Sequence, residues 1–408
     1  MPAATVDMSG NRPSTREHHR PPPPLPFDVL LEVAARTDPA TLVCFAAACK
    51  DLYRHIADGA FHRRLRLRHA GRFVPSLLHG HLLGNWDTDL RLVDTTTAEA
   101  ATRTFSPGGG GGASASYMLP IAARDGLALI RLSDDRLRVF SPATGRSHTL
   151  PPRSTHDGGQ YVLLVGDGVG GIVGRPFQVL NVKTVLTKTY GLQIQIFSSE
   201  RGTWGPSTEV PTPVTQRTHW LQQLVKPLVV GDTVNWLYKS NNLHYIFTLH
   251  VGKAQVTLTK LPTSFDLACT IPFAMPRAQI LLATASTSRN LMVLVANDDN
   301  ISAWVQSDHT VRWKEQPQVI IEHEAFRRFA KPSQTIESRL GSFRLKWFGE
   351  RSGIVIIGVP SLGCLFWLDL QTKEIVRWFP YSSATAFGLI CPYEMDLSSW
   401  VPTLRKTF

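Results

Sequence analysis

The chain has 408 residues, of which 43% are hydrophobic and 18% are charged, which is typical of a globular protein with two or three folding units and a sizeable core. The formal net charge of +11 suits a polyanionic partner, but nearly half of the excess comes from five arginines within residues 63–72. Five scattered cysteines fit neither a disulfide framework nor a zinc spacing, and no apolar stretch is long enough to span a bilayer. The N-terminus also lacks the apolar region of a secretory signal. We therefore expect an intracellular protein, cytoplasmic and/or nuclear, without a membrane partner.

Residues 1–24 are polar and end in four prolines, so we expect a disordered arm there. Helical spacing of apolar residues begins after Pro26. Asp38 and Pro39 form a start signal for a second helix, because an aspartate side chain caps free N–H groups and proline suits the first turn. The apolar positions that continue at helical spacing are Leu42, Phe45, Cys49 and Leu52. Gly59 interrupts this pattern, and a further short helix that carries the arginines is expected from Ala60 to about His69.

Residues 71–116 are interpreted as a linker. Leucines at positions 77, 78, 82 and 83 are expected to finish a helical packing layer. Five glycines, Gly108 to Gly112, follow, but no Gly-Lys-Ser/Thr comes after them, so a flexible loop is favoured over a phosphate-binding loop.

From Tyr117 onward, short apolar strands alternate with polar turns. The repeat spacing of about 40–50 residues is that of the four-stranded units of a β-propeller. Five units are clear and a sixth is indicated, with the C-terminal strands closing the ring against the N-terminal ones. We therefore predict an all-β domain over residues 117–408, a β-propeller of about six blades, with a β-sandwich as the alternative. With the helices that precede it, the chain is an α+β multidomain protein.

Residues 25 to about 62 resemble an F-box. Residues 25–33 (LPFDVLLEV) are similar to the opening of that motif, residues 38–43 (DPATLV) to its second helix start, and residues 49–53 (CKDLY) to its later Cys/Ser-Lys segment. Leu52 stands where many F-boxes have tryptophan, which leaves the strength of the partner contact open.

The resemblance implies a three-helix domain over residues 25–70 that binds a Skp-family adaptor and, through it, a cullin–RING ubiquitin ligase. Helices totalling about forty residues bury little core of their own, so surplus apolar side chains would remain for a partner. The residues expected to bind the Skp adaptor are Leu25, Pro26, Leu30, Leu31, Val33, Leu42, Val43, Cys49, Lys50, Leu52 and Ile56.

The rest of the chain resembles the associated β domains of the large plant F-box family, particularly those of grasses. The similar segments are residues 141–145 (SPATG), 196–200 (IFSSE), 347–353 (WFGERSG) and 393–397 (YEMDL). Such domains bind target proteins, and the target of this chain is unknown.

Other motifs favour structural roles. Residues 166–171 match GxGxxG, but a dinucleotide site needs a helix next, and strand-like residues follow, so a glycine-rich hairpin is expected. Six histidines, at positions 18, 19, 62, 69, 79 and 81, lack the partners of a four-ligand metal site. No catalytic motif is present, so we expect no enzyme activity, cofactor or metal.

The function predicted is that of a substrate-recognition adaptor of an SCF-type cullin–RING E3 ubiquitin ligase. The alternative is a basic nucleic-acid or polyanion-binding protein that uses the arginine-rich helix 63–72. We do not expect a nucleic-acid partner, because the aromatic residues that stack on bases are not apparent in this helix.

Overall fold

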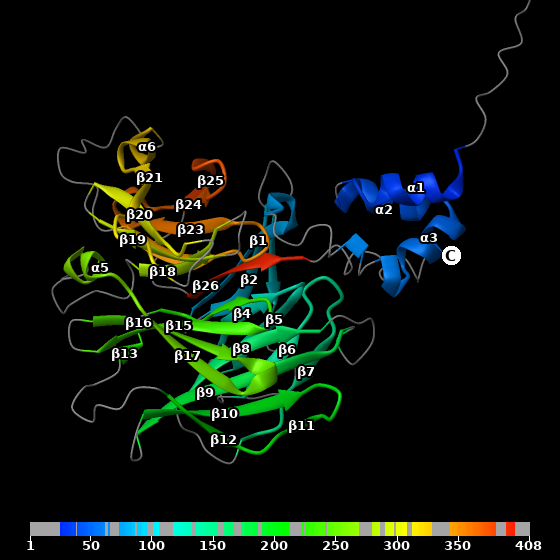
Figure 1. Ribbon diagram of the computed structural model, residues 1–408. Helices are drawn as coiled ribbons and strands as arrows, with labels where there is room; N and C mark the ends of the chain where they lie inside the picture. The colour runs from blue at the N-terminus through cyan, green and yellow to red at the C-terminus, as the bar shows by residue number, and fades with distance from the viewer. Residues whose placement is uncertain are drawn as a thin grey trace, which may run out of the picture.

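The computed structural model describes residues 25–37, 39–61, 64–65, 73–85, 88–95, 101–105, 117–132, 136–153, 159–166, 173, 175–186, 190–212, 222–223, 225–240, 243–268, 280–285, 290–297, 299–307, 312–328, 343–380 and 389–395. These residues form a small helical unit and, beside it, six β-sheets (Figure 1). The predicted N-terminal arm and the five-glycine loop lie outside the described residues.

The helical unit consists of α1 (Phe27–Ala34), α2 (Pro39–Ala48) and α3 (Lys50–Ile56). α1 begins directly after Pro26, and Asp28 places a negative charge in its first turn, where free N–H groups carry partial positive charge. α2 begins at Pro39, as predicted, whereas the expected cap Asp38 lies outside the described residues. Helices of seven to ten residues are marginal alone, so their mutual packing must hold them.

The six sheets are antiparallel and contain four or five strands each. The second blade is β4 (Met118–Arg124), β5 (Leu127–Leu132), β6 (Leu137–Phe140) and β7 (Ser147–Thr149). The third blade is β8 (Gln160–Val165), β9 (Phe177–Leu186), β10 (Tyr190–Ser198), β11 (Thr203–Trp204) and β12 (Thr208–Pro211). The fourth blade is β13 (Gln222–Gln223), β14 (Leu228–Val230), β15 (Thr233–Ser240), β16 (Leu243–His250) and β17 (Gln255–Lys260).

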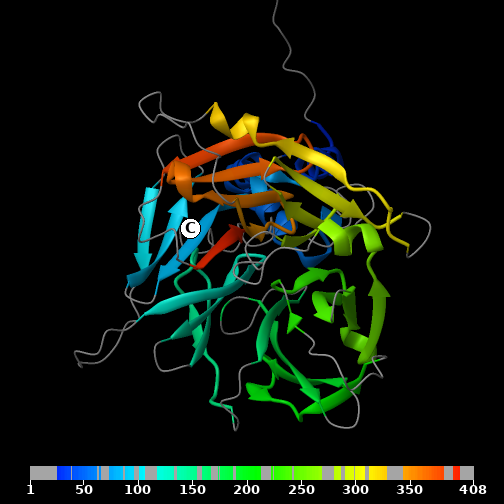
Figure 2. The same cartoon turned by 90° about the vertical axis from the view of Figure 1, so that its left-hand side faces the viewer.

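The fifth blade is β18 (Ile280–Thr284), β19 (Leu291–Ala296), β20 (Asn300–Val305) and β21 (Gln318–Glu322). The sixth blade is β22 (Arg344–Phe348), β23 (Ile354–Val359), β24 (Cys364–Asp369) and β25 (Glu374–Pro380). Short helical segments lie between strands: η1 (Pro75–Leu77), η2 (Val251–Lys253), α5 (Thr263–Ala268), α6 (Glu324–Arg327) and η4 (Pro360–Leu362). Figure 2 shows the sheets arranged around a common centre, which confirms the predicted six-blade β-propeller.

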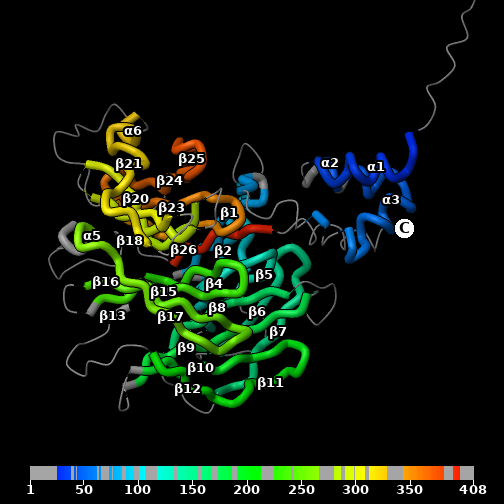
Figure 3. The backbone as a smooth tube through the Cα atoms, in the orientation of Figure 1, coloured from blue at the N-terminus to red at the C-terminus, as the bar shows by residue number. Residues whose placement is uncertain are grey.

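The closing blade joins the two ends of the ring. It consists of β1 (Leu78–Asn85), β2 (Thr88–Asp94), β3 (Ala101–Phe105) and β26 (Leu389–Glu394). β26 pairs antiparallel with β1, with Leu82 opposite Cys391, and Figure 3 shows the two strands side by side. This pairing leaves no open sheet edge between the first and last blades. The predicted closure by C-terminal strands is therefore confirmed.

The predicted linker at residues 71–116 is wrong for residues 78–85, 88–94 and 101–105, which form three strands of the closing blade. The expected helical packing of the leucines at 78, 82 and 83 is wrong for the same reason, whereas Leu77 of η1 does pack in the core of the helical unit. β1 reads LHGHLLGN and contains no β-branched residue, so its local strand propensity is weak. Its pairing with a strand more than 300 positions later makes it a strand, and no local pattern reports that partner.

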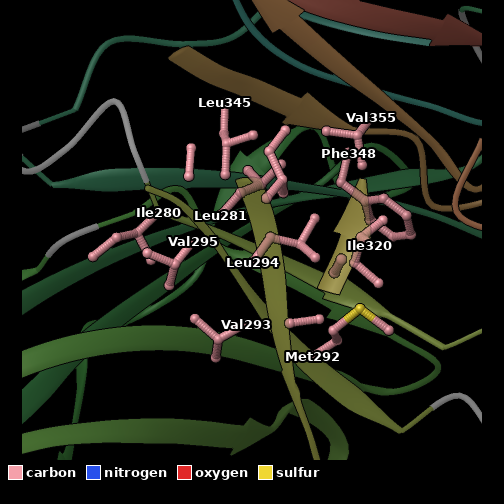
Figure 4. Close-up of a cluster of buried hydrophobic side chains, with 14 of the residues drawn as sticks. Ile280, Leu281, Met292, Val293, Leu294, Val295, Ile320, Leu345, Phe348 and Val355 are labelled. Carbon is pink, nitrogen blue, oxygen red and sulfur yellow. The ribbon is translucent and has the colours of Figure 1, made fainter. Parts of the chain in front are cut away.

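Blade-to-blade packing supplies most of the hydrophobic core. β18, β23 and β24 are buried along their whole length, because each is covered on both faces. Figure 4 shows side chains of the fifth and sixth blades interleaving, with Leu281 and Leu294 near Leu345 and Phe348. Apolar runs of this kind favoured strands rather than helices in the sequence.

Two glycine-containing segments of the sequence connect neighbouring strands of a blade. Residues 141–145 turn β6 into β7, and Gly145 has φ +69° there, a conformation that favours glycine. β8 pairs antiparallel with β9, so strands flank the GxGxxG segment on both sides. Most of the segment itself, residues 167–172, lies outside the described residues.

Candidate partner-binding surface

A row of exposed apolar side chains runs along one face of α1. Leu25, Val29 and Val33 are 60%, 43% and 40% exposed. Val29 and Val33 lie four residues apart in α1, which places them above one another on the helix surface, and Leu25 lies just before the helix begins. Of the six large exposed hydrophobic side chains in the described part of the chain, these are three, and the others are Val319, Val376 and Trp378. We call this row the α1 apolar row.

The opposite face of α1 packs into a closed core. Ala34 and Ala35 are fully buried, and Leu30 and Leu31 are half-buried against the other helices. The buried side chains of this cluster are Ala34, Ala35, Leu42, Ala46, Leu52, Ile56, Phe61, Leu65 and Leu77. The helical unit therefore fills its own interior and still exposes the α1 apolar row.

Three residues predicted to bind the Skp adaptor lie in this core instead. Leu42, Leu52 and Ile56 are 1%, 6% and 0% exposed, so the prediction of a surface contact is wrong for them in this structure. Helical periodicity marks an apolar face but does not say which neighbour covers it. Leu52, which stands at the usual tryptophan position, packs in the core and presents no surface to a partner.

The other residues predicted to bind the Skp adaptor differ in how exposed their side chains are. Leu25, Pro26, Val33, Cys49 and Lys50 are exposed, with the last two at the start of α3. The side chain of Val43 lies outside what the structure describes. Val29 was not among the predicted contacts, although the apolar residues at 25, 29 and 33 signal the row in the sequence.

The arginine-rich segment is described only at two residues. Leu65 is buried in the helical core, and Arg64 forms an ion pair with Glu32 of α1. Arg36 also pairs with Glu32, at 2.8 Å. The partner of Arg64 therefore lies within the helical unit.

The segment after the helices is anchored on the sixth blade. The Val74 amide donates a hydrogen bond to the Arg351 carbonyl at 2.8 Å. The Phe73 ring packs against Phe348, and Val74 packs against the helical core. Residues 73–78 therefore connect the helical unit to the propeller through a packed joint.

A buried charge cluster holds the second and sixth blades together. Asp125, in the β4–β5 turn, is 4% exposed and accepts hydrogen bonds from Arg351 at 3.1 and 3.3 Å. Burial alone would raise the pKa of Asp125, but Arg351, Arg124 and Arg175 together hold it below its ordinary value. A charged Asp125 is thus compensated on several sides, as a buried carboxylate requires.

Two further carboxylates complete this cluster. Glu394 of β26 accepts hydrogen bonds from the Ser352 amide and hydroxyl at 2.7 and 2.6 Å, and Glu350 pairs with Arg124. Burial raises the pKa of both glutamates, and these contacts partly oppose it. Residues 347–353 and 393–395, which belong to two of the segments that resemble the plant β domains, thus meet in space and have a structural role at the ring closure.

The two described histidines among the metal candidates lie on β1. Burial lowers the pKa of His79, and it lowers that of His81 to about 4, so both are neutral at physiological pH. No group of three His, Cys, Asp or Glu side chains among the described residues is arranged to hold a metal ion. In the same part of the chain, no helix has the length and apolar character needed to cross a membrane.

Comparisons with known proteins bear on the propeller. No curated protein matches the chain. Among solved structures, a nidogen/laminin complex aligns at 11% identity over 76% of this chain and 97% of the matched chain, with a TM-score of 0.42. The Dos1 propeller aligns at 10% identity over 74% and 69%, with a TM-score of 0.32. Apo AztD from Citrobacter koseri aligns at 10% over 78% and 82%, with a TM-score of 0.35.

A family of proteins provides the match by sequence. The family is described as "Domain of unknown function (DUF7595)", and the match covers residues 113–407, which span the second to sixth blades and β26. The matched segment is more than half of the chain. This chain belongs to the DUF7595 family.

Proposed function

We propose that the chain is a non-enzymatic substrate-recognition adaptor of an SCF-type cullin–RING ubiquitin ligase. In this proposal the helical unit binds a Skp-family adaptor and the propeller binds a target protein. The chain supplies no catalytic group and acts by holding the target close to the chemistry of another subunit. Its place of action is the cytoplasm and/or the nucleus.

The observation that carries the proposal is the α1 apolar row. Apolar side chains exposed together on a small helical unit are costly in water unless a partner covers them. The unit has filled its own core, so the row is surplus to its folding. The row also includes Leu25 and Val33, two of the positions that the F-box resemblance assigns to the adaptor contact.

The propeller supports the second half of the proposal. A β-propeller fold suggests a protein-interaction domain, since it displays loops and strand edges on a rigid scaffold. The anchored segment at residues 73–78 would hold a bound target in a defined position relative to the helical unit. Affinity capture in the presence of a proteasome inhibitor would identify the target.

The test changes the row without touching the core. In the double variant Val29→Asp, Val33→Asp, two exposed apolar side chains become charged. We expect binding to a purified Skp-family adaptor to weaken at least about tenfold in isothermal titration calorimetry, because buried apolar anchors dominate such contacts. The control is Val376→Asp on β25, a valine of similar exposure, 50%, on the propeller.

Circular dichroism must show that both variants remain folded. Undiminished adaptor binding by the folded double variant would contradict the proposed surface. Absence of binding by the unmodified chain would contradict the proposed function itself.

A further inference from the structure

A cavity of about 260 Å³ lies among the inner strands of the propeller, independent of the helical unit. Its walls come from β4, β8, β22 and β26 and from the residues that precede β14. These strands stand at the inner edges of their blades and neighbour one another around the ring. Residues from four blades and the closing strand therefore meet in one chamber.

The chamber is mostly apolar, with a few charged groups. Leu119, Tyr161, Trp347 and Leu389 are among the apolar and aromatic lining residues. Sites for small molecules commonly combine such walls with a small number of charged groups that orient the ligand. The charge of those groups indicates which ligands fit.

The negative groups of the lining already have partners. Glu394 accepts hydrogen bonds from Ser352 and from the Arg351 amide. Glu350 pairs with Arg124 and accepts a hydrogen bond from the Val229 amide at 3.1 Å. Both carboxylates are thus engaged in the ring closure and are poor sites for a ligand cation.

Lys226, a positively charged residue of the lining, lies over an aromatic ring. The Lys226 ammonium lies 3.6 Å from the centroid of the Trp347 ring. Among the described residues, no carboxylate lies within ion-pairing distance of Lys226. Burial, with a contribution from Lys346, lowers the pKa of Lys226 to about 8, against an opposing effect of Cys391.

A second cation lines the same chamber. The Arg131 guanidinium lies over the Tyr161 ring, 5.9 Å from its centroid. Aromatic faces stabilise such cations only in part, and the half-buried Lys226 ammonium still carries a desolvation cost. A carboxylate that entered the chamber would supply the missing charge.

We propose that this cavity binds a small organic carboxylate with a flat apolar body. The carboxylate pairs with Lys226, and the apolar body lies against the Tyr161 and Trp347 walls. The site is separate from the α1 apolar row and does not depend on the ubiquitin-ligase proposal.

Phenylacetate is the probe, and phenylacetamide is its uncharged counterpart of nearly the same shape. In isothermal titration calorimetry on the full chain at pH 7, we expect phenylacetate to saturate one site per chain. Phenylacetamide should bind at least about tenfold more weakly, because its carbonyl can accept a hydrogen bond from Lys226 but carries no negative charge to pair with the ammonium. This comparison needs no variant and so does not depend on how well a mutant folds.

The variant Lys226→Met keeps the length of the side chain and removes its charge. It should lose the preference for the acid over the amide, whereas Lys253→Met, at an exposed lysine of η2, should retain it. Equal binding of acid and amide to the unmodified chain, or an unchanged preference in folded Lys226→Met, would overturn the proposal. Failure of phenylacetate to saturate the folded chain would overturn it as well.

Discussion

The ring of Phe73 packs edge-on against the ring of Phe348, with the centroids 5.8 Å apart. This contact joins the segment that leaves the helical unit to the sixth blade. It is possible because Gly353, next to it, has no side chain: a Cβ atom there would lie 2.3 Å from the Phe73 ring. The joint between the two parts therefore depends on one glycine.

Replacing Gly353 with alanine should loosen this joint. Gly353 has φ +73°, so alanine is strained there, and its Cβ would also displace Phe73. We expect a loss of about 3 kcal/mol in the free energy of unfolding, measured by urea denaturation. The matched control is Gly145→Ala, where φ is +69° and no atom lies within 4 Å of a built Cβ. It should lose only about 1 kcal/mol, and equal losses would refute the role of Phe73.

Replacing Asp125 with asparagine should weaken the contact between the second and sixth blades. Asparagine tolerates the φ of +47° at this position but leaves Arg351 without its carboxylate partner. We expect a loss of about 2 kcal/mol at pH 7, because the partly exposed Arg351 side chain loses its charge-assisted hydrogen bonds to the buried Asp125 carboxylate. Asp51→Asn, at an exposed ion pair with Arg54, should change stability little.

The pH dependence of this loss has a defined sign. The folded-state pKa of Asp125 is lowered, so its stabilising contribution is fully present above the unfolded pKa of about 3.9 and is lost as pH falls through the lower folded value. The difference between the unmodified chain and Asp125→Asn should therefore shrink only in strong acid. A difference that disappears between pH 7 and pH 5 would contradict this assignment.

Replacing Leu82 with alanine tests the closing blade. Leu82 of β1 is fully buried between β2 and β26, so truncation should leave a cavity and cost about 3 kcal/mol in the free energy of unfolding. Leu83, its half-buried neighbour, should lose less when changed in the same way. Thermal unfolding followed by circular dichroism compares the two variants. If both were neutral, residues 78–85 would behave as the linker that their composition suggests.

The local pattern of the sequence was sufficient to predict much of the architecture. The start signal at Pro39 and the apolar spacing placed the first two helices but ran α2 and α3 together across the break at Cys49, and the alternation of strands with turns placed five blades. Each of these features is encoded over fewer than about 50 consecutive residues, within the reach of periodicity and turn chemistry.

Contacts between distant segments decided the remainder. β1 is a strand because β26 pairs with it, and Leu42, Leu52 and Ile56 are core residues because neighbouring helices cover them. Lys226 lies in an ordinary-looking stretch, VKPLVV, and only the ring brings it over Trp347. The burial of a residue, its strand partner and the charges around it depend on its neighbours in space. They could therefore not be assigned from the sequence alone.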